Sequence, residues 1–71
     1  MEVFQERLRE MRKKAGLTQE AAAKEIGISF RSYRRCESGE CEPGFYSVVK
    51  IAEYFQVSLD YLAGRSDTPK P

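Results

Sequence analysis

Between residues 18 and 39 the sequence places helix-starting and helix-ending residues so close together that few folds can accommodate them. Thr18 supplies a side-chain oxygen of the kind that favours a helix N-terminus, and Gly27 ends the helix that follows because glycine tolerates a left-handed backbone. Only two residues later, Ser29 is suited to cap a further helix over about residues 30–37. This spacing predicts two short helices joined by a sharp turn.

Three further helices are expected from apolar residues at helical spacing. The first covers residues 3–15 and ends at Gly16, after a basic last turn that suits a helix C-terminus. The next covers about residues 45–55, and a short last helix, capped by Ser58, covers about residues 58–62. No alternation of the kind found in β-strands competes with this interpretation.

The chain is therefore predicted to form an all-α, compact five-helix domain over residues 1–64. Residues 65–71 contain two prolines and no apolar anchor, so a flexible C-terminal tail is expected there. The predicted core consists of side chains on the inner faces of the helices. These are Phe4, Leu8, Met11, Ile26, Tyr33, Cys36, Val48, Ile51, Ala52 and Phe55.

Charge is distributed unevenly along the 71 residues, although the net charge is only +1. Residues 1–35 hold nine Lys and Arg against five Asp and Glu, whereas residues 36–71 hold three against six. The two parts carry +4 and −3. Because salt screens charges more than about 10 Å apart, a polyanion responds to the local basic patch and not to the net charge.

Several classes of function are disfavoured by composition. The chain has no His, so the commonest general base and metal ligand is missing, and we expect neither an enzyme, nor a metal or cofactor, nor a small-molecule substrate. Cys36 and Cys41 fit no metal or redox motif; Cys36 is expected in the core and Cys41 in an exposed loop. The absence of a long apolar run and of a signal peptide argues against a membrane partner and predicts a cytoplasmic location.

Blocks along nearly the whole chain resemble one family, the helix-turn-helix regulators of the phage-repressor and xenobiotic-response-element type (the Cro and repressor class). The matching blocks are Leu8-Arg9-x-x-Arg12, Gly16-Leu17-Thr18-Gln19-Glu20, Ala23-x-x-Ile26-Gly27-Ile28-Ser29, Glu37-Ser38-Gly39, Glu42-Pro43, Lys50 to Leu62 except position 56, and Gly64 to Asp67. The resemblance implies a phage-repressor-type fold whose second and third helices form the helix-turn-helix. It also implies a transcriptional regulator, a repressor in particular, that binds an inverted-repeat operator as a dimer.

The resemblance further implies which residues meet double-stranded DNA in the major groove. They are Gln19, Ser29, Phe30, Arg31, Ser32, Arg34 and Arg35. Gln19 corresponds to a phosphate-clamping position, and the arginines lie on the face that reads bases, where a guanidinium can bind guanine O6 and N7 together. Phe30 is suited to pack against a thymine methyl group, and Ser32 to reach a phosphate or a base edge.

Two features depart from the family pattern. Ala22 stands where a large aliphatic residue is usual, so Tyr33 is expected to help fill the core beneath the second helix. Glu40 and Glu42 make acidic a loop that is basic in many relatives, so this loop is expected to lie further from DNA or to bind it weakly.

Two alternatives stay open on the sequence. The three arginines of the third helix also fit an ordinary solvated surface. In addition, the acidic second half and its aromatic residues fit a protein-interaction module of the same fold that docks an antirepressor, a toxin or another regulator. A separate alternative concerns Tyr46 and Tyr54, for which the expected core position competes with contact to a partner subunit.

Overall fold

Hydroxyl side chains begin three of the helices, as the sequence predicts. In each case the side-chain oxygen accepts a hydrogen bond from the N–H three residues further on, at 3.1 Å for Thr18, 3.0 Å for Ser29 and 2.9 Å for Ser58. These oxygens satisfy N–H groups that a helix leaves without an internal partner. The start of each of these helices is therefore set by a single local contact.

The computed structural model describes residues 2–40 and 42–70, and five α-helices run through them. In chain order they are α1 (Glu2–Lys14), α2 (Gln19–Ile26), α3 (Phe30–Ser38), α4 (Phe45–Phe55) and α5 (Leu59–Ala63). Each bound lies within one residue of the bound expected from the sequence, and the described residues contain no strand. The prediction of an all-α five-helix fold is confirmed. The expectation for Cys41 falls outside the described residues.

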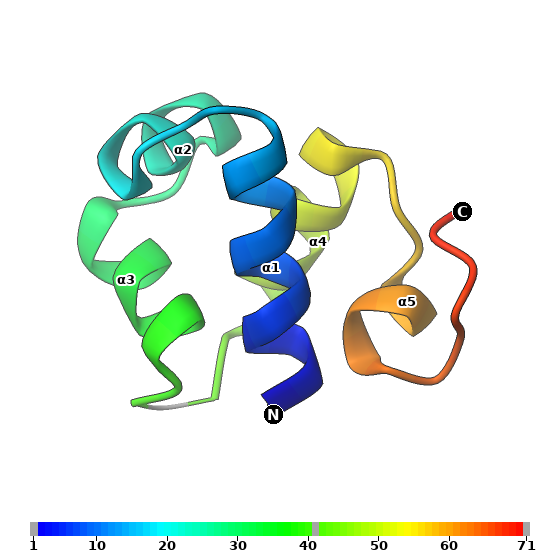
Figure 1. Ribbon diagram of the computed structural model, residues 1–71. Helices are drawn as coiled ribbons and strands as arrows, with labels where there is room; N and C mark the ends of the chain where they lie inside the picture. Colours follow the sequence, from blue (N-terminus) through cyan, green and yellow to red (C-terminus); the bar gives the residue numbers. More distant parts are fainter. Residues whose placement is uncertain (1, 41, 71) are drawn as a thin grey trace.

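Helix α1 lies in the middle of the molecule, between α3 on one side and α5 on the other (Figure 1). Helix α2 packs on both α3 and α4, and α4 also packs on α5. The resulting body measures 27 × 24 × 18 Å. None of its described helices is both long enough and apolar enough to cross a membrane.

The core holds most of the side chains that the helical spacing placed there. Tyr33 is the largest fully buried side chain, and Ala22 is fully buried in the same cluster. Three predicted core residues, Met11, Val48 and Phe55, are only half-buried and pack against the edge of the cluster. In so small a domain few positions are covered on every side.

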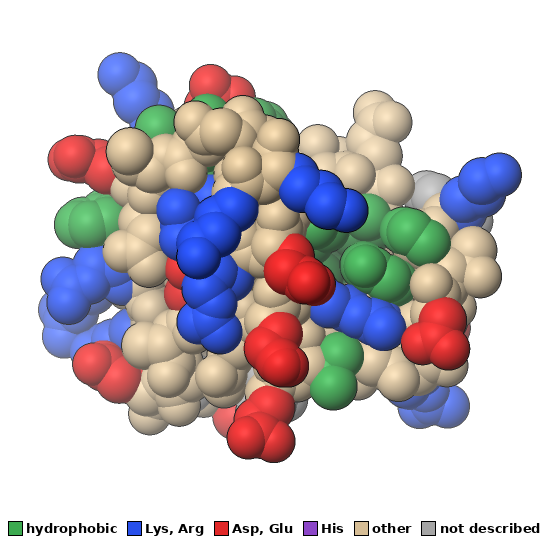
Figure 2. Space-filling model, in the orientation of Figure 1, with side chains coloured by type: hydrophobic (Ala, Val, Ile, Leu, Met, Phe, Trp, Pro, Cys, Tyr) green, Lys and Arg blue, Asp and Glu red, His purple; other side chains and the backbone are tan. Residues whose placement is uncertain are grey.

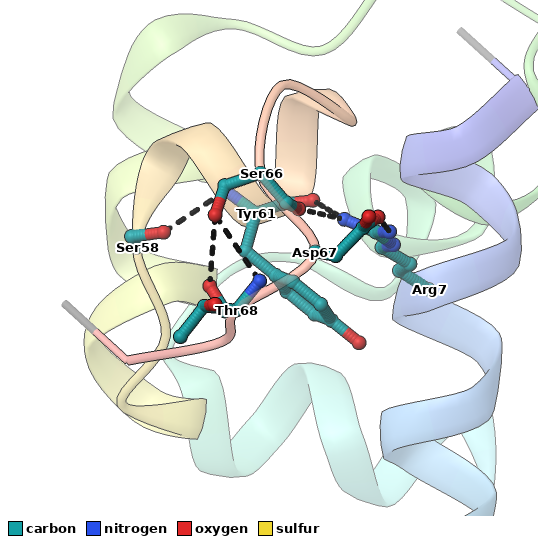
Figure 3. A network of polar contacts seen from close by, with 6 residues as sticks. All are labelled: Arg7, Ser58, Tyr61, Ser66, Asp67 and Thr68. Atoms are coloured by element: carbon teal, nitrogen blue, oxygen red, sulfur yellow. Dashed lines mark hydrogen bonds and ion pairs between the residues drawn. The ribbon is translucent and has the colours of Figure 1, made fainter.

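Polar contacts hold the segment after α5 against the rest of the molecule (Figure 3). Arg7 of α1 donates hydrogen bonds to the carbonyl oxygens of Tyr61 and Ser66, the latter at 2.8 Å, and forms an ion pair with Asp67 at 3.3 Å. The Ser58 N–H donates to the Pro69 carbonyl at 2.9 Å. The sequence offered no apolar anchor for residues 65–71, and the described part of this segment is anchored by polar groups instead. Its predicted flexibility stays a prediction.

Candidate nucleic-acid interface

Helix α3 has two chemically different faces. Tyr33 and Cys36 face the core, as their spacing predicted. On the outer side Phe30, Arg31 and Arg34 are exposed. Figure 2 shows Lys and Arg side chains over α1 and at the edge of the molecule where α3 lies. The short helix is therefore held by its apolar face and presents cations outward.

The turn between α2 and α3 sets the direction in which α3 projects. Gly27 has φ of 95°, in the left-handed region, and its N–H donates to the Ala23 carbonyl at 2.9 Å. The next N–H, that of Ile28, donates to the same carbonyl at 3.1 Å. This paired capping ends α2 and turns the chain sharply before α3 begins at Phe30, as the sequence predicted. Ala23 itself is buried, which allows the two helices to pack closely.

The three arginines of α3 are held in different ways. Among the described residues, Arg31 has no ion pair or hydrogen bond from its side chain. The Arg34 guanidinium lies over the Phe30 ring, 5.6 Å from its centroid. Arg35 Nε lies 3.9 Å from a carboxylate oxygen of Glu40, where the Arg35 side chain is partly exposed and the Glu40 side chain is exposed.

These side chains line one hollow on the outer surface of α3, with a volume of about 390 Å³. Its walls are formed by Phe30, Arg31, Arg34, Arg35, Ser38 and Glu40. The guanidinium groups can donate several hydrogen bonds into this hollow, and the ring offers an apolar surface beside them. The structure thus gathers four of the predicted contact residues into one accessible site.

The two predicted serine contacts lie at the N-terminus of α3 and bind each other. Ser29 Oγ accepts from the Ser32 N–H at 3.0 Å and donates to Ser32 Oγ at 2.9 Å. Ser29 is exposed and Ser32 is half-buried. This pair orders the first turn of α3, whose remaining N–H groups and positive dipole end suit an anion.

Gln19 lies at the start of α2, apart from the arginine hollow, and its amide binds Glu37, for which the sequence predicted no role in a site. Gln19 Nε2 donates to Glu37 Oε1 at 3.0 Å. The Glu37 carboxylate also accepts from Arg12 Nε at 2.6 Å and from Arg12 Nη2 at 3.2 Å, and it accepts from the Tyr33 hydroxyl. One buried carboxylate therefore joins α1, α2 and α3.

Burial alone would raise the pKa of Glu37, but the hydrogen bonds from Arg12, Tyr33 and Gln19 outweigh burial and hold this pKa below its ordinary value. Burial and the neighbouring carboxylate raise the pKa of Tyr33, so its hydroxyl stays a donor. The hydrogen bond to Glu37 raises the pKa of Arg12. All three groups thus keep the protonation states that the network requires at neutral pH.

A signal for this network was present in the sequence. Glu37 stands four residues after Tyr33 and next to Cys36, so it falls on the inner face of α3, where a carboxylate needs a cationic partner. Which of the many cations of α1 it binds is decided by how the helices cross.

The described residues contain no group of three or more His, Cys, Asp or Glu side chains arranged to hold a metal ion.

The family described as helix-turn-helix matches residues 8–62, so the chain belongs to the helix-turn-helix family. It is similar to the cryptic phage CTXphi transcriptional repressor RstR of Vibrio cholerae serotype O1, with 48% identity over 62 residues, 87% of this chain and 55% of that protein. It is also 34% identical over 64 residues to the HTH-type transcriptional regulator ImmR of Bacillus subtilis. This match covers 90% of this chain and 50% of ImmR. The chain thus spans about half the length of these curated relatives.

Among solved structures, the fold is similar to the DNA-binding domain of the P22 C2 repressor, with a TM-score of 0.73 and 33% sequence identity. The similarity covers 92% of this chain and 88% of that domain. The resemblance to phage repressors inferred from the sequence blocks is confirmed by the family match, the named relatives and this structure.

Proposed function

We propose that this chain is a sequence-specific domain for double-stranded DNA in a transcriptional regulator, a repressor in particular, and that α3 enters the major groove. The observation that carries the proposal is the outer face of α3, where Arg31 and Arg34 stand exposed on a helix anchored through Tyr33. The functions named for the relatives, a transcriptional repressor and the DNA-binding domain of a repressor, support it.

The groove of B-form DNA, about 12 Å wide, admits an α-helix, and an arginine fork matches guanine O6 and N7. We assign Arg31, Arg34 and Arg35 to base edges and Phe30 to a thymine methyl group. We assign Ser29 and Ser32, at the first turn of α3, to contacts with the DNA backbone. We assign Gln19, at the start of α2, to a DNA phosphate. We assign the domain no catalytic role.

The binding unit we propose is a homodimer on an inverted repeat, because one domain reads too few base pairs to be selective in a genome. The surface of α4 and α5 supports this, since Phe45 and Tyr46 are 76% and 67% exposed and Leu59 is also exposed. Tyr54 is used within the domain instead, where its hydroxyl donates to Glu25 at 2.5 Å. The two relatives named above come from bacteria, whose DNA lies in the cytoplasm, and the cytoplasm is therefore the compartment we propose.

Selection of bound sequences from a random duplex library tests the proposal, followed by titration of the selected duplex by fluorescence anisotropy. We expect Arg31→Ala and Arg34→Ala each to weaken binding by roughly five- to 150-fold, the equivalent of about 1–3 kcal/mol, with little change in melting temperature. Arg65→Ala is the matched control because it removes the same charge in the segment after α5. Sedimentation on the duplex gives the stoichiometry, for which we expect two chains.

Unchanged affinity in both α3 variants would remove this helix as the reading element, and a single chain on the duplex would exclude the dimer.

The exposed Phe45 and Tyr46 favour a second candidate, a protein-interaction module that docks an antagonist such as an antirepressor or a toxin. The absence of any duplex binding at low salt would favour that candidate, because non-specific binding arises from phosphate contacts alone.

A further inference from the structure

The end of α3 brings an acidic side chain back onto the arginine face. Gly39 has φ of 76° and its N–H donates to the Arg35 carbonyl at 3.0 Å, so the chain turns sharply after the helix. The Glu40 N–H then donates to Ser38 Oγ at 3.3 Å. A Cβ at position 39 would lie 2.2 Å from Gln5 Nε2, so the chain passes close to the end of the Gln5 side chain at this point. Local geometry thus places Glu40 beside Arg35.

The carboxylate of Glu40 lines the same hollow as the arginines and lies 3.9 Å from Arg35 Nε. The two side chains are 66% and 42% exposed, respectively, so water screens the pair and its partners can exchange. The pair is loose, unlike the buried Arg12–Glu37 pair at 2.6 Å. An incoming ligand can therefore replace Glu40 as the partner of Arg35 at small cost.

We propose that Glu40 is a specificity-determining residue. Its carboxylate competes with DNA phosphates for the Arg35 guanidinium, and it is displaced only by a base edge that accepts two hydrogen bonds from that guanidinium. The inference rests on the proposed function of α3. Any DNA sequence presents phosphates, and a carboxylate within a few ångströms of the cation repels them. A matching guanine offers two acceptors to Arg35, which outweighs the loss of one exposed ion pair. Glu40 thus lowers non-specific binding more than specific binding.

The experiment compares wild-type protein with Glu40→Gln on two duplexes, the selected site and a scrambled duplex of the same length and composition. For Glu40→Gln we expect affinity for the scrambled duplex to rise about threefold at 100 mM NaCl, the size of effect that one exposed ion pair produces. The salt dependence should steepen by about 0.9, equivalent to one more phosphate neutralised. The ratio of specific to non-specific affinity should fall.

Glu42→Gln is the matched control, because it removes the same charge from the same loop and Glu42 forms no ion pair with Arg35 within the described chain. Arg35→Ala completes a double-mutant cycle, in which Glu40→Gln should have no more effect than Glu42→Gln. Two results would overturn this inference and leave the proposed function intact. One is an equal change in affinity for the scrambled duplex in Glu40→Gln and Glu42→Gln, and the other is a Glu40→Gln effect of unchanged size in the Arg35→Ala background. If wild-type protein binds neither duplex at low salt, the proposed function fails together with it.

Discussion

Among the single side chains, Glu37 has the most demanding position, because it is only 3% exposed and still carries a charge. Its carboxylate accepts hydrogen bonds from three elements of the fold, and no buried side-chain polar atom of the described residues is left without a partner. A buried ion pair adds little net stability over a well-packed apolar pair, but removing one partner leaves the other charge uncompensated. The cost of losing Glu37 therefore exceeds the value of the contact itself.

We expect Glu37→Gln to lower the free energy of unfolding at pH 7 by about 3 kcal/mol, because Arg12 then has no counter-charge in a site from which most water is excluded. Folding lowers the pKa of Glu37, so its contribution is present above the ordinary value of about 4.3 and is lost as the pH falls through the lower folded value. The difference in the free energy of unfolding between wild-type and Glu37→Gln should therefore become smaller below about pH 4.3. Urea unfolding at a series of pH values from 7 to 3 measures this difference.

The exposed carboxylate of Glu6, replaced in Glu6→Gln, serves as the control for that series and should change stability little. If the difference in the free energy of unfolding between wild-type and Glu37→Gln stays constant down to pH 3, the charge of Glu37 is not what stabilises the network.

Between elements, the turn from α2 to α3 decides where the candidate site points. Gly27 occupies a backbone conformation that a residue with a Cβ adopts only at a cost, although a Cβ there would meet Lys50 side-chain atoms at an ordinary 3.5 Å. The constraint at this position is therefore conformational and not steric crowding. A different case closes α4, where Gln56 takes φ of 55° without being a glycine.

Gly27→Ala should lower the free energy of unfolding by about 1–2 kcal/mol through this backbone cost, as measured by thermal or urea denaturation. Gly44→Ala is a matched control, because Gly44 has φ of −68° and open space around its missing Cβ. That control should cost no more than about 0.5 kcal/mol, because Gly44, the N-cap of α4, makes no side-chain capping bond that the substitution would remove. Equal losses in the two variants would argue against a conformational role for Gly27.

Across the whole molecule, Arg7 joins the first helix to the segment that follows the last. Its guanidinium lies over the Tyr61 ring, 4.0 Å from the centroid, while it also binds the backbone of α5 and of residue 66 (Figure 3). These contacts join residues far apart in the chain, so they form only when α1 and α5 are packed against each other.

Arg7→Ala should release the segment after α5, because the remaining contacts of that segment are few and solvent-exposed. The Ser58 N–H, which donates to the Pro69 carbonyl, should then exchange with solvent at least about tenfold faster, as amide exchange by NMR would show. Lys13→Ala removes the same charge from an exposed position of α1 and should leave this rate unchanged. An unaltered Ser58 rate in Arg7→Ala would show that other contacts hold the segment.

Local signals carried much of the prediction. The caps at Thr18, Ser29 and Ser58 and the stop at Gly27 act over three or four residues, so the bounds of the helices could be read directly from the chain. Helical spacing likewise separated the buried Tyr33 from the outward arginines of α3, since both faces belong to one helix. The assigned contacts with DNA remain predictions.

The helices and the chemistry of each helix face thus follow from the sequence alone. The pairing of Glu37 with Arg12 and Gln19, and the binding of Arg7 to the segment after α5, follow from the way the helices pack. The two kinds of feature differ in the range of the interactions that produce them. A cap or an apolar stripe is complete within one helix, whereas a hydrogen bond between distant residues depends on angles and distances between helices that no short stretch of sequence encodes.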